Sequence, residues 1–126
     1  MKPILLIIDD EWAICRLLQF YFDKHYQVVT MTDSEEAVSW LKSNKPQAII
    51  ADLEMPVLNG KDIIRSVRAQ RKTSKVPLII LSGSESTEER IACLQLGADD
   101  YMIKPFNPKE LEIRLDVINK RTRKLI

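Results

Sequence analysis

Three aspartates stand where apolar segments end. Asp9 and Asp10 follow the run Ile4–Ile8, and Asp52 follows the run Ala48–Ala51. If these runs are neighbouring strands of a parallel sheet, the carboxylates share one pocket, because ligands bind such sheets beyond the carboxyl ends of the strands. At roughly 5 Å and an effective dielectric of about 20, each carboxylate pair repels by about 3 kcal/mol and raises one pKa by around two units. A cation is therefore expected, and a few hard oxygen ligands suit Mg²⁺.

Further polar groups follow two other apolar runs. Lys104 comes after Tyr101–Ile103, and Ser82 and Gly83 come after Leu78–Leu81. Taken singly, an aspartate after a strand most often caps the next helix, a lysine is most often solvated, and a serine most often bonds to backbone. Together, a carboxylate nucleophile, a divalent cation, an ammonium and a hydroxyl donor are the groups that transfer a phosphoryl group. The combination favours phosphoryl chemistry.

The elements that must position these groups are visible in the apolar pattern. The four runs above and a fifth, Gln27–Met31, are expected as strands, and most are continuous, as is typical of strands buried on both faces of a parallel sheet. The segments between them each carry one apolar stripe at helical spacing. Three expected helix starts have capping residues at the usual offsets: Asp33 with Glu36, Ser86 with Glu89, and Asn107 before Pro108 and Glu110. This alternation predicts a doubly wound α/β sandwich.

Size and charge limit the function classes. With 126 residues, 45% hydrophobic and 29% charged residues and a net charge of +1, the chain is expected to form one domain over residues 1–126, of which 119–126 end the last helix or begin a linker. The balanced charge predicts no direct contact with nucleic acid or membrane, and the apolar runs are too short to cross a bilayer. We expect a cytoplasmic protein with Cys15 and Cys93 as buried, reduced thiols.

Several motifs resemble the receiver (CheY-like) domains of bacterial two-component response regulators, and the resemblance runs from Lys2 to about Arg123. The motifs are Asp9-Asp10-Glu11, Asp52-Leu53-Glu54-Met55-Pro56 with Asn59-Gly60, Ser82-Gly83, Gly97-Ala98-Asp99-Asp100-Tyr101 and Lys104-Pro105-Phe106. The resemblance implies a flavodoxin-like (βα)5 three-layer sandwich whose parallel strands lie in the order 2-1-3-4-5. It also implies a signalling switch rather than an enzyme that turns over an external substrate.

The resemblance further implies a role for each acidic residue. Asp52 is the expected phosphoacceptor, which takes a phosphoryl group from a sensor histidine kinase, a phosphotransfer protein or a small donor such as acetyl phosphate. Asp10, Asp52 and the backbone carbonyl of Glu54 are the expected Mg²⁺ ligands, with Asp9 acting mostly through coordinated water. Lys104 is expected to pair with the phosphate.

Other site roles come from the same resemblance. Ser82 is the expected switch hydroxyl, Gly83 offers a second donor through its amide, and Tyr101 is expected to move inward on phosphorylation. The Lys104-Pro105 bond is expected to be cis. The side chain of Glu54 has two possible effects: it strengthens the metal site or it interferes with the incoming donor.

The stretch from Gly97 to Arg114 is closest to the OmpR/PhoB class of transcription regulators. That class dimerises on phosphorylation through the fourth helix, the fifth strand and the fifth helix. The matching charged pairs here are Arg90 with Glu110 and Asp100 with Arg114, whereas Asp116 puts an acid where the class tends to carry a basic residue. Alternatively, these residues form a solvated surface whose ion pairs contribute little. An effector domain outside this chain would carry any DNA binding.

Three other interpretations remain. A flavodoxin-like nucleotide or flavin site needs a Gly-, Ser- or Thr-rich loop after the first strand, where Asp9 to Glu11 stand. A hydrolase of the haloacid dehalogenase type has an aspartate two residues after its nucleophile, where this chain has Glu54. A degenerate receiver would act as a phosphorylation-independent interaction module.

Overall fold

A parallel sheet of five strands, in the order β2-β1-β3-β4-β5, forms the centre of the molecule. The computed structural model describes residues 1–124, with side chains up to residue 121. The strands are β1 (Ile4–Ile8), β2 (Gln27–Met31), β3 (Ala48–Asp52), β4 (Leu78–Ser82) and β5 (Asp100–Ile103). All five expected strands are confirmed, and β3 and β4 each extend one residue further than expected, so that they end on Asp52 and Ser82.

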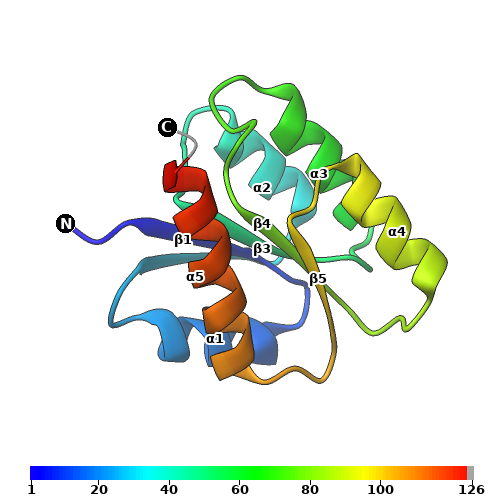
Figure 1. The fold of residues 1–126 in the computed structure, drawn as a ribbon, viewed down its shortest axis with the longest axis horizontal. Helices are drawn as coiled ribbons and strands as arrows, with labels where there is room; N and C mark the ends of the chain where they lie inside the picture. The colour runs from blue at the N-terminus through cyan, green and yellow to red at the C-terminus, as the bar shows by residue number, and fades with distance from the viewer. Residues whose placement is uncertain (125–126) are drawn as a thin grey trace.

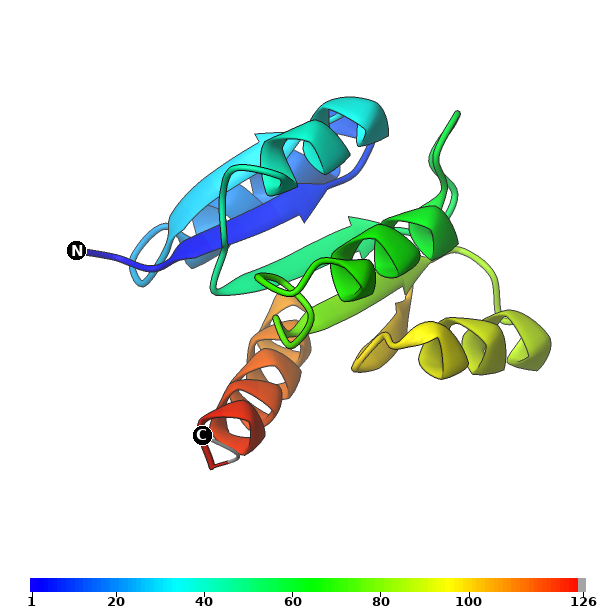
Figure 2. The same cartoon turned by 90° about the horizontal axis from the view of Figure 1, so that it is seen from above.

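Helices connect the strands and cover both faces of the sheet (Figure 1). They are α1 (Trp12–Phe22), α2 (Ser34–Leu41), α3 (Gly60–Ala69), α4 (Thr87–Leu96) and α5 (Pro108–Lys124). Figure 2, seen from above, shows the sheet between the helices on its two sides. The strand order and the layers confirm the expected (βα)5 sandwich. Within the described residues, no helix has the length and apolar character needed to cross a membrane.

Each face of the sheet has its own hydrophobic core. On one face, Leu6 and Ile8 of β1 pack with buried residues of α2, α3 and α4. On the other face, Leu5 and Ile7 pack with α1 and α5. Every residue of β3 and β4 is buried, which explains why these strands read as continuous apolar runs. Burial of each such aliphatic side chain stabilises the fold by about 1.5–3 kcal/mol, so the strand ends are held firmly in place.

The helix starts follow the expected capping pattern. Asp33 accepts hydrogen bonds from the amides of Glu35 and Glu36, and Ser86 accepts one from Glu89. Asn107 accepts one from the Lys109 amide at 2.8 Å. A reciprocal capping box that was not predicted from the sequence lies at the start of α3, where the Asn59 side chain accepts from the amide of Asp62 and the Asp62 side chain accepts from that of Asn59.

A close backbone contact holds the start of α3 against the end of β3. The Gly60 amide donates to the carbonyl of Leu53 at 2.8 Å. A Cβ on Gly60 would lie 2.8 Å from the Cα of Leu53 and 3.0 Å from the carbonyl oxygen of Asp52. Glycine is therefore needed at this position for a steric reason, and its contact fixes the backbone just after Asp52.

The loop between β3 and α3 contains a strained turn at Val57. Its φ is 67°, and the amide of Leu58 donates to the carbonyl of Pro56 at 2.8 Å across it. The left-handed region costs an ordinary residue about 1–2 kcal/mol. The Ser34 hydroxyl braces the turn by donating to the Pro56 carbonyl at 3.1 Å and accepting from the Leu58 amide at 3.3 Å.

Candidate functional site

Three carboxylates meet at the carboxyl edge of the sheet. β1 and β3 are adjacent, with Ile8 paired to Ala51, so the residues that follow each strand lie side by side. Asp9, Asp10 and Asp52 each offer an oxygen, and these oxygens all lie within 4.8 Å of one another. The expectation from the sequence that the three acids come together is confirmed. With Lys104 they are called the acidic cluster below.

Helix capping does not explain these aspartates. The residue at the N-cap of α1 is Glu11, and its side chain makes no capping hydrogen bond. Asp9 Oδ1 accepts from the Glu11 amide at 2.9 Å, while its other oxygen, Oδ2, has only Lys104 as a close polar contact within the described residues. The Asp9 side chain is 1% exposed, and a buried carboxylate oxygen with so little hydrogen bonding is costly.

Lys104 supplies the positive charge of the cluster. Its Nζ lies 3.0 Å from Asp9 Oδ2, 3.2 Å from Asp52 Oδ1 and 3.4 Å from Glu11 Oε1. The peptide bond between Lys104 and Pro105 is cis, as expected. One ammonium thus faces several carboxylates, and the cluster keeps an excess of negative charge.

Burial and charge shift the protonation of the cluster. The pKa of Asp52 is raised from 3.8 to about 6, first by burial and then by the negative charge of Asp9, while Lys104 opposes both. Burial also raises the pKa of Asp9. For Lys104, burial lowers the pKa, but bonds and charges from Asp9 and Asp52 outweigh it and the pKa is raised. Carboxylate repulsion was the cause expected from the sequence, whereas loss of solvation is the larger cause at Asp52.

Two hydrogen-bond donors at the end of β4 lie beside the cluster, and both donate to the side chain of Glu54. The Ser82 hydroxyl donates to Glu54 Oε2 at 2.9 Å and lies 3.1 Å from Oε1. The Gly83 amide donates to Glu54 Oε1 at 3.0 Å. The Ser84 amide in turn donates to Ser82 Oγ at 2.9 Å. The side chain of Glu54 thus faces β4, and the sequence offered no signal for this direction.

The family comparison agrees with this geometry. The model of the response regulator receiver domain matches residues 5–116. The chain belongs to this family. It is 41% identical to ycf27 of Guillardia theta over 98% of this chain and 48% of that protein. It is 40% identical to the response regulator SaeR of Staphylococcus aureus over 95% of this chain and 52% of that protein. This receiver domain therefore spans about half the length of the curated relatives it matches.

Solved structures agree with the fold. The receiver domain of the Francisella response regulator 1452 superposes with a TM-score of 0.87 at 34% identity, covering 96% of this chain and 99% of that one. The receiver domain of the sensor histidine kinase PA1611 from Pseudomonas aeruginosa, which was solved with a magnesium ion in its active site cleft, has a TM-score of 0.82 at 28% identity, covering 95% and 99%. The receiver family also accounts for the flavodoxin-like fold.

The donor set of this receiver domain fits a small divalent cation. Three carboxylate oxygens within 4.8 Å are the hard ligands that Mg²⁺ prefers, and Asp9 Oδ2 is buried beside a single ammonium. Asp10 is exposed, so the group opens toward solvent and leaves room for water ligands. An added cation would therefore relieve both the repulsion and the poor solvation of these oxygens.

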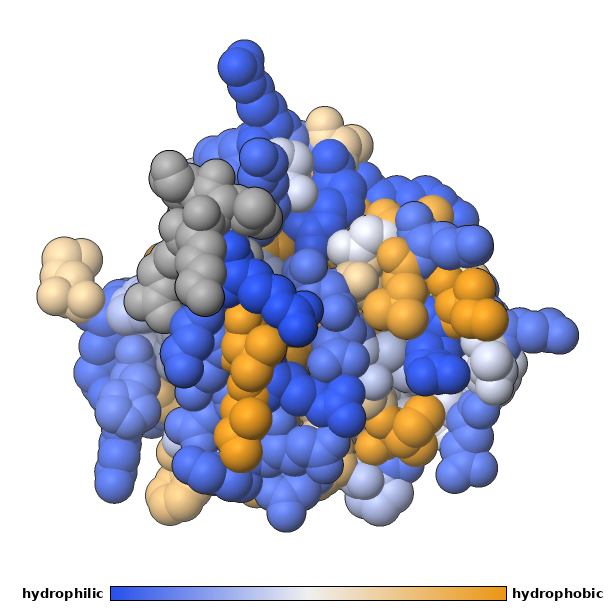
Figure 3. Space-filling model, in the orientation of Figure 1, coloured by the Kyte–Doolittle hydropathy of each residue, from blue (hydrophilic) through white to orange (hydrophobic). Residues whose placement is uncertain are grey.

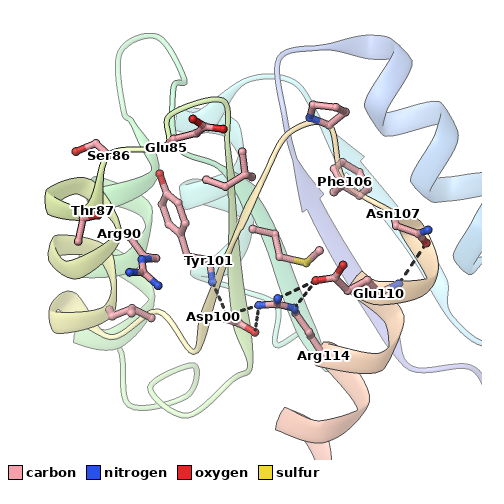
Figure 4. A pocket seen from close by; sticks show the side chains of 14 residues that line it. Glu85, Ser86, Thr87, Arg90, Asp100, Tyr101, Phe106, Asn107, Glu110 and Arg114 are labelled. Atoms are coloured by element: carbon pink, nitrogen blue, oxygen red, sulfur yellow. Dashed lines mark hydrogen bonds and ion pairs between the residues drawn. The ribbon is translucent and has the colours of Figure 1, made fainter.

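Tyr101 links the Ser82 end of the receiver domain to its far face. The ring is 5% exposed, and its hydroxyl donates to the carbonyl of Ser84 at 3.0 Å. Tyr101 is thus buried in this structure, and its inward movement on phosphorylation stays a prediction. Tyr101 also lines a groove of about 650 Å³ between α4, β5 and α5, called the α4–β5–α5 groove below (Figure 4).

Three charged residues of the α4–β5–α5 groove form ion pairs within the chain. Arg114 contacts both oxygens of Asp100 at 3.0 and 3.1 Å and Glu110 Oε2 at 2.8 Å. Arg90 lines the groove and has no ion pair among residues 1–121. Figure 3 shows hydrophobic side chains gathered over α4 and α5 on this face. The exposed large hydrophobic residues of the two helices are Ile91, Leu94, Ile113 and Val117.

Proposed function

We propose that this receiver domain is a Mg²⁺-dependent switch phosphorylated on Asp52. The observation that carries the proposal is the position of Asp52, whose Oδ1 lies 3.2 Å from Lys104 Nζ and whose carboxylate lies within 4.8 Å of Asp9 and Asp10 oxygens. At the end of β3, the Asp52 carboxylate can therefore act as a nucleophile beside a fixed ammonium and beside oxygens of the kind that bind a metal ion.

The proposed reaction is a direct phosphoryl transfer. An Asp52 carboxylate oxygen attacks the phosphorus of the donor and forms an acyl phosphate. The bond from phosphorus to the donor's imidazole nitrogen or acetate oxygen breaks, and its electron pair leaves with that donor atom. The nucleophile must be ionised, and burial and the charge of Asp9 raise the pKa of Asp52 to about 6 without a cation, so a bound cation would favour the ionised, reactive form.

Magnesium, when bound, would neutralise charge on the transferring phosphoryl oxygens. Asp10 and Asp52 would hold it directly together with the backbone carbonyl of Glu54, and Asp9 would act through water. Lys104 would pair with a phosphoryl oxygen, as the geometry of its contact with Asp52 allows. Ser82 and the Gly83 amide would donate to the remaining oxygens once about two negative charges arrive on Asp52.

The proposed setting is cytoplasmic two-component signalling from one domain over residues 1–126. The phosphodonor would be a sensor histidine kinase, a phosphotransfer protein or a small donor. PhoP of Bacillus subtilis, a transcriptional regulatory protein for alkaline phosphatase synthesis, is 35% identical over 50% of its length. By analogy, we propose that the output is transcription regulation through a separate effector domain, and that the receiver domain itself contacts neither nucleic acid nor membrane.

The proposed activated form is a homodimer through the α4–β5–α5 groove. The four charged residues expected at that interface all line the groove, namely Arg90, Asp100, Glu110 and Arg114. Because Arg114 already pairs with Asp100 and Glu110 in one chain, dimerisation would exchange existing ion pairs rather than create pairs from free charges. Arg90 is the residue left to recruit an acid from the second copy.

Intact mass after incubation with acetyl phosphate and Mg²⁺ tests the proposal. We expect one added phosphoryl group on the native chain, and none on Asp52→Asn or in the presence of EDTA. Retained addition on Asp52→Asn would move the phosphoacceptor elsewhere. If neither acetyl phosphate nor a kinase donor modifies the folded native chain, the domain is a phosphorylation-independent interaction module instead.

A further inference from the structure

The carboxylate of Glu54 lies where the proposed function places phosphoryl oxygens. Its two oxygens take the hydroxyl of Ser82 and the amide of Gly83, at 2.9 and 3.0 Å. These are the two donors that the proposed switch needs for the phosphoryl group on Asp52. A hydroxyl and an amide each have one proton to donate, so neither donor can fully serve Glu54 and a phosphoryl group at once.

The contact between Glu54, Ser82 and Gly83 joins a carboxylate acceptor to two hydrogen-bond donors. Ser82 is fully buried, so its hydroxyl has a fixed location and gains from an ionised acceptor. Glu54 is exposed and its carboxylate reaches this donor pair from the solvent side. An exposed side chain can leave without opening a cavity in the core. Glu54 can therefore hold the donors in the resting state and withdraw when a more highly charged anion arrives.

A chain of hydrogen bonds connects this contact to the α4–β5–α5 groove. The Ser84 amide donates to Ser82 Oγ at 2.9 Å, and the Tyr101 hydroxyl donates to the Ser84 carbonyl at 3.0 Å. Tyr101 lines the groove. The position of the Ser82 hydroxyl is thus communicated through Ser84 to a residue on the face proposed for dimerisation.

We infer that Glu54 is an internal occupant of the phosphoryl-oxygen site, which competes with the incoming anion and holds Ser82, Ser84 and Tyr101 in their present arrangement before phosphorylation. The inference rests on the proposed function for the identity of the site. Of the two possible effects of the Glu54 side chain, it selects interference with the incoming phosphoryl group and not a stronger metal site. Glu54 acts as a positioning residue through Ser82 and Gly83.

The first test needs neither metal nor phosphodonor. Amide NMR spectra of the native chain are compared with Glu54→Ala and with Glu85→Gln, a matched control that removes an exposed carboxylate from the same loop after β4. We expect the Gly83 amide proton to move upfield in Glu54→Ala because it loses a charged acceptor, and the Ser84 amide to shift with it. Glu85→Gln should leave both amides in place. An unchanged Gly83 amide in Glu54→Ala overturns the inference.

The second test measures competition directly with beryllium fluoride, a mimic of the phosphoryl group, in the presence of Mg²⁺. We expect the half-saturating concentration to fall roughly tenfold in Glu54→Ala, since the donors no longer exchange one charged acceptor for another. The half-saturating concentration of Glu54→Gln should lie between those of Glu54→Ala and the native chain, because its side-chain amide oxygen still accepts hydrogen bonds. Glu85→Gln should have the same half-saturating concentration as the native chain. Equal affinity in all four proteins overturns the inference alone, whereas absence of binding in all four overturns the proposed function and the inference with it.

Discussion

The acidic cluster and the α4–β5–α5 groove both contain basic and acidic side chains within about 3 Å, yet they differ in burial. In the cluster, the side chains of Lys104, Asp9 and Asp52 are 13%, 1% and 4% exposed. In the groove, Arg114 and Glu110 are 39% and 52% exposed. Coulomb interactions are several times stronger away from water, and the cost of desolvation grows in parallel. Acidic and basic side chains therefore interact strongly in the cluster and only weakly in the groove.

The excess of negative charge differs as well. One lysine lies among three aspartates in the cluster, whereas in the groove Arg114 is shared by two acids at the surface. The desolvated group with the larger excess of negative charge is poised to take up a cation, and the solvated group can exchange partners at little cost. The acidic cluster is therefore suited to chemistry, and the α4–β5–α5 groove is suited to an interface.

The largest expected effect is a pH-dependent gain in stability from Asp52→Asn. In the folded chain the pKa of Asp52 is raised from 3.8 to about 6, so the folded state binds the proton more tightly than the unfolded state. The contribution of Asp52 to stability is therefore fully present below about pH 4 and is lost as the pH rises to about 6. At pH 7 and low salt without Mg²⁺, we expect Asp52→Asn to raise the free energy of unfolding by about 3 kcal/mol, and by almost nothing at pH 3.5.

Urea denaturation at both pH values measures this difference, with Asp116→Asn, at an exposed position of α5, as the control. The control should change stability by less than about 0.5 kcal/mol at either pH. A gain for Asp52→Asn that is the same at pH 3.5 and pH 7 would mean that ionisation of Asp52 is not what strains the cluster. Desolvation of charge would then not be what distinguishes the cluster from the groove.

The second effect concerns the backbone that supports the cluster. Gly60→Ala places a methyl group 2.8 Å from Leu53 Cα and 3.0 Å from the carbonyl oxygen of Asp52, so the end of β3 must shift. We expect a loss of about 2 kcal/mol in the free energy of unfolding, despite the better helix propensity of alanine. Gly83→Ala is the matched control, because its methyl would meet Glu54 Oε1 at an ordinary 3.6 Å. Equal losses for the two variants would show that the close contact at Gly60 is readily relaxed.

The strands and the grouping of the acids were predictable from the sequence because both depend on local pattern and on one topological rule. Continuous apolar runs showed where β3 and β4 lie, and residues after neighbouring parallel strands must share an edge. The direction of the Glu54 side chain was not predictable. An exposed glutamate has many rotamers, and the choice depends on donors 28 and 29 residues away in the chain, at Ser82 and Gly83.

One backbone feature and one set of side-chain contacts were also hidden from the sequence. Val57 has φ of 67°, which β-branched residues disfavour, and it is held by contacts of Ser34 with both sides of the turn. Tertiary context here overrides local preference. The family resemblance implies a dimer in which Arg114 pairs with Asp100 and Arg90 with Glu110, but Asp100 and Glu110 are both close enough to pair with Arg114 in one chain.

The third effect is stabilisation by Mg²⁺. A cation that binds only the folded cluster raises the free energy of unfolding by about 1.4 kcal/mol at ten times its dissociation constant. We expect this gain in thermal or urea denaturation of the native chain, and we expect Asp10→Asn to need a higher Mg²⁺ concentration for the same gain. Sodium chloride at matched ionic strength is the control for general screening. If sodium and magnesium salts stabilise the chain equally, the cluster has no specific cation site.

The smallest expected effect lies in the groove and completes the comparison. Arg114→Ala removes contacts to Asp100 and Glu110 that are partly open to water, so the free energy of unfolding should fall by less than about 1 kcal/mol. In a double-mutant cycle with Asp100→Ala, the coupling should also stay below about 1 kcal/mol and shrink as salt is added, because exposed charges are screened.

A coupling above about 2 kcal/mol that resists salt would put the groove in the same class as the cluster. It would also make the proposed exchange of partners costly, since a dimer would first have to break a strong pair in each chain. A weak, screened coupling instead leaves Arg114 and its acids free to pair with a second copy while the chemistry stays at the buried cluster.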